Sequence, residues 1–458
     1  MATKSSSFRV GKVQAYLRAR VWYLCYHENG QRHRPRVGAD REAARQLAAQ
    51  INAQLEVGAP AALSFTPISI PELRERWLQH HEQVLRSSVQ TICRYRTATD
   101  HLLRFLEQRP VRHASHFHAT HAEEFVRYLR NSAVSPNGHA HAAKRPLMDQ
   151  GLRYILECCR ALFNYAAKRR HLSPYAENPF RTLEIDRIPV ENIRPVELFT
   201  AEQERAFFTA CDDWQLPIFL TLALTGLRPG ELTHLLLPDD LDLAAGLMRV
   251  RNKPRLGWQV KTRNERDIPL IPELVAVLQA HLSGRASGPL FQSRQRKANW
   301  KAIGASAMEQ ELSRRIAESE PEAGKPLDRV ARLRLARRLW SDIGALQENC
   351  VRREFMRLTK AIGLPTCTAP KLFRHLFATA LQEGRVDPLI RNELMGHVAA
   401  RERNAGHGLA MTAVYTHTQP EVRRSQLLEA LSGRPAVSVV WEWLAGQGVT
   451  RLKPSVSE

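Results

Sequence analysis

Six residues in the C-terminal half of the sequence have side chains suited to metal-free chemistry at a phosphodiester. They are two arginines, two lysines, a histidine and a tyrosine: Arg228, Lys261, Lys371, Arg374, His397 and Tyr415. Guanidinium groups match phosphate oxygens, a partly desolvated lysine can protonate a leaving oxygen, and tyrosine becomes a nucleophile when a neighbour assists removal of its proton. No carboxylates cluster beside them in a pattern for Mg²⁺. The set predicts phosphodiester cleavage without a metal or other cofactor.

Arg228 is expected in a tight turn between two helices. The apolar segment 215–225 predicts a helix that ends at Gly226, which suits a left-handed cap, and Pro229 suits the first turn of the next helix. Glu231 follows three residues after Arg228 and is near enough to hold its guanidinium. The alternative is an ordinary surface arginine at a turn.

Lys261 is expected on a strand of a small antiparallel sheet. The segments MRVRNK and WQVKTRNERDIPL predict its strands, with a polar turn around Asn264 and Glu265. A lysine on a strand face is usually only solvated, so Lys261 is informative only together with the other residues.

Arg374 and Lys371 belong to the segment TAPKLFRHLFATALQEG, which predicts a helix that stops at Gly384. Apolar residues at helical spacing define its buried stripe: Leu372, Phe373, Leu376, Phe377, Ala380 and Leu381. We expect Lys371, Arg374 and His375 on the remaining face. Like charges at i and i+3 repel unless an anion lies near them, so this face predicts an anion site.

His397 is expected directly after a short helix. Asp387 suits its N-cap, Pro388 its first position and Gly396 its end. A single histidine at a helix end is more often structural than catalytic. Eighteen residues later Tyr415 stands between small polar residues and a histidine, outside any hydrophobic repeat.

The stretches TGLRPGEL, KTRNERDIPL, KLFRHLFAT, LMGH and TAVYTH, taken in this order, resemble the catalytic domain of the tyrosine recombinase, or phage integrase, family. The resemblance covers residues 200–425, and the helical block 70–185 resembles the core-binding domain of that family. Each motif alone is weak, but five in order are specific.

The resemblance implies a role for each residue. Tyr415 would attack the scissile phosphate of duplex DNA and form a 3′-phosphotyrosyl link, while Arg228 and Arg374 would bind that phosphate. Lys261 would protonate the leaving oxygen, and His397 would hold a nonbridging oxygen or assist the tyrosine. The covalent link stores the phosphodiester energy, so neither ATP nor a metal is needed.

The sequence departs from the family pattern in two places. Lys371 stands where the family usually has histidine; lysine keeps a donor and a charge but cannot accept a proton near neutral pH, so we expect phosphate binding without proton transfer. Residues 294–360 form an arginine-rich helical insertion. It is expected to extend the DNA contact or to dock a neighbouring protomer, and a solvated charged helix is the alternative.

The predicted fold class is mainly α with small β-sheets (α+β), divided into domains. We expect an N-terminal sheet-and-helix module over 1–60, a helical core-binding domain over 70–185, a catalytic domain over 198–430 and a C-terminal tail over 431–458. The N-terminal module resembles arm-type DNA-binding domains of some integrases, and an Asn29-Gly30 hairpin turn is its clearest signal. An apolar helix in the tail could pack into a neighbour or fold back on its own chain.

The composition indicates a soluble cytoplasmic protein that works on DNA. Among 458 residues the formal net charge is +21, and such an excess normally means a polyanionic partner, nucleic acid before membrane. Seven scattered cysteines without CxxC spacing favour reduced thiols. The longest apolar run is shorter than the roughly 18 residues of a membrane helix. We therefore expect double-stranded DNA as partner, no membrane association and a nucleoid location.

Three rival functions differ from recombination. A type IB topoisomerase would use the same tyrosine chemistry without pairing two sites, a catalytically impaired DNA-binding regulator would fit Lys371, and a structural nucleoid protein would explain only the charge. The resemblance implies a homotetramer on paired sites, with DNA-bending accessory proteins as possible partners. The sequence identifies neither the target DNA sequence nor the choice between integration, excision, inversion and dimer resolution.

Overall fold

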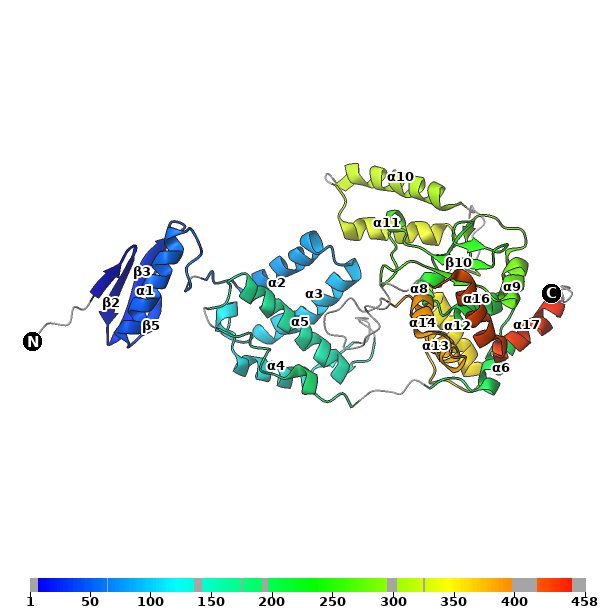
Figure 1. Cartoon of the computed structure of the whole chain (residues 1–458), viewed down its shortest axis with the longest axis horizontal. Coiled ribbons are helices and arrows are strands. Elements are labelled where there is room, and N and C mark those ends of the chain that lie inside the picture. Colours follow the sequence, from blue (N-terminus) through cyan, green and yellow to red (C-terminus); the bar gives the residue numbers. More distant parts are fainter. Residues whose placement is uncertain are drawn as a thin grey trace, which may run out of the picture. The chain divides into compact units, whose positions relative to one another are not determined.

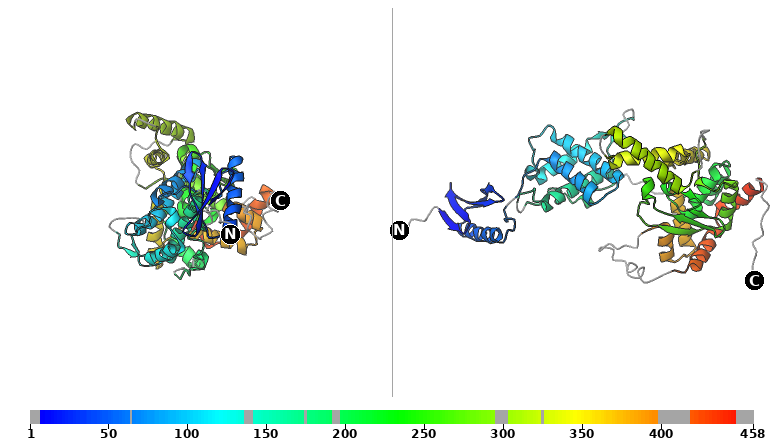
Figure 2. Two further views of the ribbon diagram at one scale, coloured as in Figure 1. Left: turned by 90° about the vertical axis from the view of Figure 1, so that its left-hand side faces the viewer. Right: turned by 90° about the horizontal axis from the view of Figure 1, so that it is seen from above.

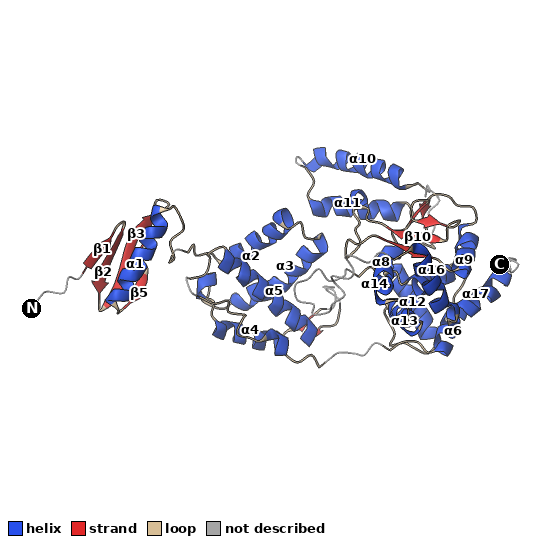
Figure 3. Cartoon of the chain, in the orientation of Figure 1, coloured by secondary structure: helices blue, strands red, loops and turns tan. Residues whose placement is uncertain are grey.

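The structure is a computed structural model of the chain, and it falls into two compact units, Met1–Arg194 and Pro195–Glu458 (Figure 1). It describes the following residues: 7–63, 65–135, 142–173, 176–191, 197–294, 303–323, 326–397 and 418–446. Helices dominate both units and the sheets are small (Figure 3). The predicted mainly helical α+β fold class is confirmed.

The first unit begins with a five-stranded antiparallel sheet covered on one face by helix α1 (Arg41–Glu56). The strands are β1 (Ser7–Val10), β2 (Val13–Arg18), β3 (Val21–Glu28), β4 (Gln31–His33) and β5 (Arg36–Gly38). Asn29 and Gly30 both have positive φ, 51° and 77°, as a tight hairpin between β3 and β4 requires. Asp40 caps α1, its side chain accepting from the Glu42 backbone.

Four longer helices form the rest of the first unit around an aromatic core. They are α2 (Ile70–Gln79), α3 (Val89–Leu106), α4 (Ala119–Arg130) and α5 (Asp149–Lys168), with the short turns η1 (His80–Val84), η2 (Ala114–His116) and η4 (Ile185–Arg187) and the strand pair β6 (Ala133–Val134) and β7 (Arg145–Pro146). Phe105, Phe117, Phe125 and Phe163 are buried together between these helices.

The second unit wraps its helices around α7 (Gln215–Thr225), all of whose residues are buried. The surrounding helices are α6 (Ala201–Thr209), α8 (Pro229–Leu232), α9 (Pro272–Leu282), α12 (Glu348–Ala361), α13 (Leu372–Glu383), α14 (Pro388–Met395), α16 (Pro420–Ser432) and α17 (Pro435–Gly446). A three-stranded sheet in the order β11 (Arg266–Pro269), β10 (Leu247–Val250), β9 (Leu241–Asp242) lies beside them, and β8 (Leu236–Leu237) pairs with β12 (Gly288–Pro289). Phe207, Phe219, Phe355 and Phe373 fill the centre.

A helical hairpin of α10 (Ala305–Ala323) and α11 (Arg329–Asp342) stands out from the second unit (Figure 2). It lies within the predicted insertion. Met308 and Leu312 of α10 and Leu339 of α11 form a small separate core with Leu256, which belongs to the short turn η5 (Pro254–Leu256). The hairpin is therefore packed onto the unit by its own apolar contacts.

The C-terminal helix α17 folds back on its own chain. Val440 and Leu444 are buried in the core of the second unit. Just before the helix, Arg434 forms a buried ion pair with Glu204 of α6 at 2.6 Å and donates to the Ala223 carbonyl at 2.7 Å. Of the two arrangements that the sequence left open, the structure has the intramolecular one.

Candidate active site

Arg228 lies in the turn between α7 and α8, as expected. The helix α7 ends at Gly226, whose φ is +61°, and Pro229 occupies the first turn of α8. A Cβ at Gly226 would approach the ring of Phe377 to 2.3 Å, so this position needs glycine for space as well as for backbone conformation. The Arg228 side chain is 23% exposed and is neither fully solvated nor buried.

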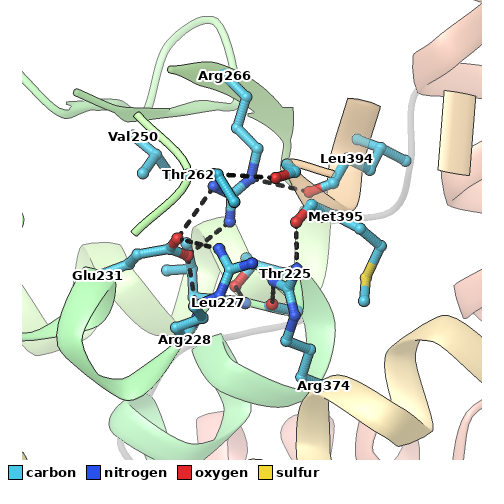
Figure 4. A network of polar contacts seen from close by, with 12 residues as sticks. Thr225, Leu227, Arg228, Glu231, Val250, Thr262, Arg266, Arg374, Leu394 and Met395 are labelled. Atoms are coloured by element: carbon cyan, nitrogen blue, oxygen red, sulfur yellow. Dashed lines mark hydrogen bonds and ion pairs between the residues drawn. The ribbon is translucent and has the colours of Figure 1, made fainter. Parts of the chain in front are cut away.

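The carboxylate of Glu231 organises two arginines (Figure 4). It accepts from the backbone N–H of Arg228 at 3.0 Å, from Nη1 of Arg228 at 2.7 Å and from Nη2 of Arg266 at 2.6 Å. Burial acts to raise the pKa of Glu231, but the hydrogen bond and charge of Arg266, and then the hydrogen bonds of Arg228, outweigh it, so the pKa is lowered. The carboxylate is ionised and fixes the direction of the Arg228 guanidinium.

Arg266 is a site residue that the sequence interpretation missed. It begins β11, its side chain is 5% exposed, and its Nε donates to the Leu394 carbonyl at 2.9 Å. The left-handed Gly396, with φ +61°, leaves room for it, because a Cβ there would lie 2.8 Å from Nη1 of Arg266. One available signal was the alternation in RDIP, which places Arg266 on the same inward side as Ile268.

Arg374 is buried, so the expectation that it lies on the face of α13 outside the buried stripe is wrong. Its exposure is 5%, and its guanidinium donates to the carbonyls of Gly226, at 2.7 Å, and Met395. These two carbonyls, at the ends of α7 and α14, supply the acceptors that make the burial possible. Burial, and next the charge of Arg228, lower the pKa of Arg374 to about 10, which still leaves it protonated at neutral pH.

His397 follows α14 directly, as expected, and is exposed. Burial of part of the ring and then the charges of Arg374, Arg228 and Arg266 lower its pKa, so the imidazole is neutral at pH 7. Its Nε2 lies 3.3 Å from Nη2 of Arg374. Because arginine can only donate, Nε2 is the acceptor and the ring proton is on Nδ1.

Lys261 lies in a turn, and its expected position on a strand is wrong. The ladder between β10 and β11 pairs Leu247–Val250 with Arg266–Pro269 and does not include Lys261. The side chain of Asn252 forms the hydrogen bonds that a neighbouring strand would otherwise provide. It accepts from the Val260 N–H at 2.9 Å and donates to the Arg263 carbonyl at 3.1 Å. Lys261 is exposed and makes no hydrogen bond or ion pair with any residue that the structure describes.

Lys371 occupies the N-cap position of α13 and is exposed. Within the described ranges it has no ion pair, and its charge contributes, after burial, to lowering the pKa of the neighbouring His375. Tyr415, expected to be the nucleophile, lies outside the described residues.

Two pockets meet at His397. One has a volume of about 310 Å³ and is lined by His375, Gln382 and Arg391 among others. The other, of about 570 Å³, lies on the sheet side and includes Arg266 in its lining. The side chain of His397 therefore borders both pockets.

The arrangement is suited to an oxyanion. Three guanidiniums, those of Arg228, Arg266 and Arg374, lie near one carboxylate, which binds the first two directly and acts on Arg374 only through its charge, so the network keeps a net positive charge (Figure 4). Among the described residues there is no group of three or more histidine, cysteine or acidic side chains placed to hold a metal ion. No helix in the described part of the chain is long and apolar enough to cross a membrane.

The family model described as "Phage integrase family" matches residues 197–421. Through these residues the chain belongs to the phage integrase family. The match spans the turn at Arg228, the sheet with Arg266, the helix that carries Arg374 and the helix that His397 follows. The phage integrase family is the one that the five sequence motifs resemble, so this prediction is confirmed.

Individual relatives are more distant. The tyrosine recombinase XerC of Rhizobium meliloti (strain 1021) is 34% identical over 115 residues, which cover 25% of this chain and 30% of that protein. The Tn1549 transposon integrase in complex with transposon right end DNA is 17% identical with a TM-score of 0.49, covering 80% of this chain and 100% of that one. A lambda integrase tetramer bound to a Holliday junction is 16% identical with a TM-score of 0.45, covering 84% and 95%.

Proposed function

We propose that this phage integrase family member is a site-specific recombinase that cuts and rejoins duplex DNA through a 3′-phosphotyrosyl intermediate. The observation that carries the proposal is the joint placement of Arg228 and Arg374, one held by the Glu231 carboxylate and the other by two backbone carbonyls, with neutral His397 beside them. Donors fixed in this way need no reorganisation when charge develops on a phosphate.

In the proposed reaction the phenolic oxygen of Tyr415 attacks the scissile phosphorus and loses its proton. The bond from phosphorus to the 5′ oxygen breaks, and Lys261, whose exposed side chain has no described partner, donates a proton to that oxygen. Arg228 and Arg374 bind nonbridging oxygens, and His397 binds one of them or receives the tyrosine proton. Attack of another 5′ hydroxyl on the phosphotyrosine reverses the step, so neither ATP nor a metal is consumed.

Lys371 would supply positive charge to the same phosphate from the N-cap of α13. Its distance in sequence from Arg374 is that of the usual family histidine, and its exposure leaves the ammonium available. A lysine does not accept a proton near neutral pH, so we assign it binding only.

The N-terminal module is proposed to bind DNA through the sheet face that α1 leaves open. Tyr16 and Tyr23 are paired in register on that face, with their rings stacked at 5.7 Å. Arg36, opposite Tyr23, and Arg18 are exposed there as well. Cations interleaved with flat rings suit a phosphate backbone and its groove.

We further propose that residues 70–185 and 198–430 together hold the duplex, and that the active assembly is a homotetramer on paired sites in the cytoplasm, on the nucleoid. Family membership and the charge of +21 support these assignments. DNA-bending accessory proteins would bring the paired sites together.

The deciding experiment traps the covalent intermediate. The protein is incubated with nicked duplexes from the flanks of its own gene in the presence of a metal chelator, quenched in detergent and examined for protein-linked DNA. Tyr415→Phe is the matched control, since it removes only the hydroxyl. An adduct formed by the wild type and absent from the variant supports the proposal, and an adduct that needs added metal contradicts it.

Lys371 favours one alternative, a DNA-binding regulator with a disabled site. That function is indicated if the protein binds one of these duplexes tightly and specifically but neither the wild type nor Lys371→His forms an adduct. Relaxation of any supercoiled plasmid, with no sequence requirement, would instead indicate a type IB topoisomerase.

A further inference from the structure

The hairpin of α10 and α11 separates its charges between its two helices. Helix α10 carries five glutamates and two arginines, whereas α11 carries five arginines and one aspartate. The two helices pack against each other through apolar residues. The hairpin therefore has an acidic member and a strongly basic one.

The arginines that face the interior of the hairpin are already paired. Arg315 of α10 forms ion pairs with Glu311 at 2.8 Å and with Asp342 at 2.6 Å. Arg332 of α11 reaches Glu320 of α10 at 3.1 Å. These pairs neutralise the side of α11 that faces α10, and ion pairs that stay partly exposed to solvent contribute little beyond local order.

Three arginines of α11 are different. Arg334, Arg337 and Arg338 are exposed, and none forms a hydrogen bond or ion pair with a residue that the structure describes. At helical spacing they lie on the side opposite Leu339 and Trp340, which are buried in the hairpin core. Like charges three and four residues apart repel, so this face is unfavourable for the helix unless an anion lies against it.

The arginine face is attached firmly to the catalytic unit. Trp340 donates from Nε1 to the Leu256 carbonyl at 3.0 Å, and its ring packs edge-on against His234 with 4.7 Å between centroids. His234 follows Glu231 by three residues, so the hairpin joins the unit close to the arginine network. The charge of Arg337 is one of the causes, after burial, that lower the pKa of His234, which is consistent with that closeness.

We propose that Arg334, Arg337 and Arg338 form a second DNA contact, which binds the phosphate backbone of the duplex outside the segment held at the cleavage site. The inference rests on the proposed function, because it takes duplex DNA as the ligand of the unit. Helical neighbours lie about 5–6 Å apart, which suits contacts to successive phosphates of one strand. The contact carries no sequence information and adds affinity and register.

The test measures binding of the full chain to a duplex of arbitrary sequence by fluorescence anisotropy, from about 50 to about 200 mM salt. One variant combines Arg334→Gln, Arg337→Gln and Arg338→Gln. The matched control combines Arg314→Gln, Arg315→Gln and Arg332→Gln, which removes the same charge from arginines that are ion-paired. A third variant changes Arg334, Arg337 and Arg338 to lysine, which keeps their charge.

If each outer arginine neutralises one phosphate, the slope of log affinity against log salt falls by about 2.7, since each contact contributes about 0.9. The advantage of the wild type over the glutamine variant then shrinks roughly 40-fold over this fourfold salt range. The control keeps the wild-type slope and the lysine variant restores it. If the affinity of the wild type depends steeply on salt and the glutamine variant has the same slope, only this inference is overturned. If the wild type does not bind duplex DNA, the proposed function is overturned as well.

Discussion

Arg266 and Glu231 form an ion pair 2.6 Å long in which neither side chain is more than 5% exposed. The pair joins the sheet to the turn at Arg228, because the same carboxylate also holds that arginine. Arg266 in addition binds the Leu394 carbonyl in α14. Two buried side chains thus connect three segments that are far apart in sequence and bring Arg228 and His397 into one region.

Glu231→Gln is expected to lower the free energy of unfolding by about 3–5 kcal/mol, because it leaves two guanidiniums without their buried counterion. Urea unfolding followed by tryptophan fluorescence measures the change. The control is Glu318→Gln in α10, since the ion pair of Glu318 with Arg314 leaves both side chains 59% exposed. It is expected to unfold like the wild type, and a wild-type midpoint for Glu231→Gln would show that the buried carboxylate does not stabilise the unit.

Gly396→Ala tests whether the packing of Arg266 against the backbone of Gly396 contributes to stability. Gly396 and Gly363 both have positive φ, +61° and +79°, but a Cβ at Gly396 meets Arg266 whereas a Cβ at Gly363 meets nothing within 4 Å. Each alanine is expected to cost about 1–2 kcal/mol for its left-handed backbone. Gly396→Ala should cost measurably more and also lower adduct yield. Equal losses of stability in the two variants would show that Arg266 adapts without cost.

Local signals in the sequence predicted the helix boundaries of the site well. Gly226 and Gly396 end their helices in the left-handed conformation, and Pro229 and Pro388 occupy first turns, as their backbone preferences require. The contact of Glu231 with Arg228 was also predictable from local sequence, because residues three positions apart lie within one helical turn.

The long-range contacts could not be predicted in this way. The buried guanidinium of Arg374 donates to the carbonyl of Gly226, 148 residues away in sequence. That of Arg266 donates to the carbonyl of Leu394, 128 residues away. Every residue has a backbone carbonyl, so such acceptors leave no mark in the sequence. The strand expected at Lys261 is absent for a similar reason. The apolar pattern predicts that backbone groups around Lys261 pair with a neighbouring strand, but the Asn252 side chain forms these hydrogen bonds instead, with the Val260 N–H and the Arg263 carbonyl.

His234→Phe is expected to remove part of the acid sensitivity of the second unit. Burial, and then the charges of Lys253 and Arg337, lower the pKa of His234 to about 4 despite its hydrogen bond to the Gly230 carbonyl. The unfolded chain binds a proton at higher pH than the folded one, so stability is lost as pH falls below about 6.5. Between pH 7 and pH 5 this histidine accounts for about 2 kcal/mol.

Phenylalanine keeps the stacking on Trp258 and removes the titrating group. Urea unfolding of both proteins at the two pH values gives the difference. A variant that loses as much stability on acidification as the wild type would assign the sensitivity to other groups.

Arg374→Lys is expected to lower the free energy of unfolding by about 1–3 kcal/mol although it keeps the charge. A single ammonium cannot reproduce the planar fork that serves the carbonyls of Gly226 and Met395, so one buried acceptor is left unpaired. Adduct formation should fall about 10²–10³-fold, as for loss of one preorganised donor. Full activity in this variant would remove Arg374 from the proposed phosphate site.

Lys371→His is expected to leave stability unchanged but to make adduct formation depend on pH. Lys371 is exposed and without an ion pair in the described ranges, so its replacement disturbs no packing. The introduced imidazole is charged only below its ordinary pKa of about 6.5. The pKa of the neighbouring His375 is lowered by burial, then by the charge of Lys371 and then by that of Arg374. Because the introduced histidine would also lie near Arg374, it should lose its charge at still lower pH. Adduct yield relative to wild type should therefore fall from pH 6 to pH 8, and a constant ratio would mean that the charge of Lys371 does not reach the phosphate.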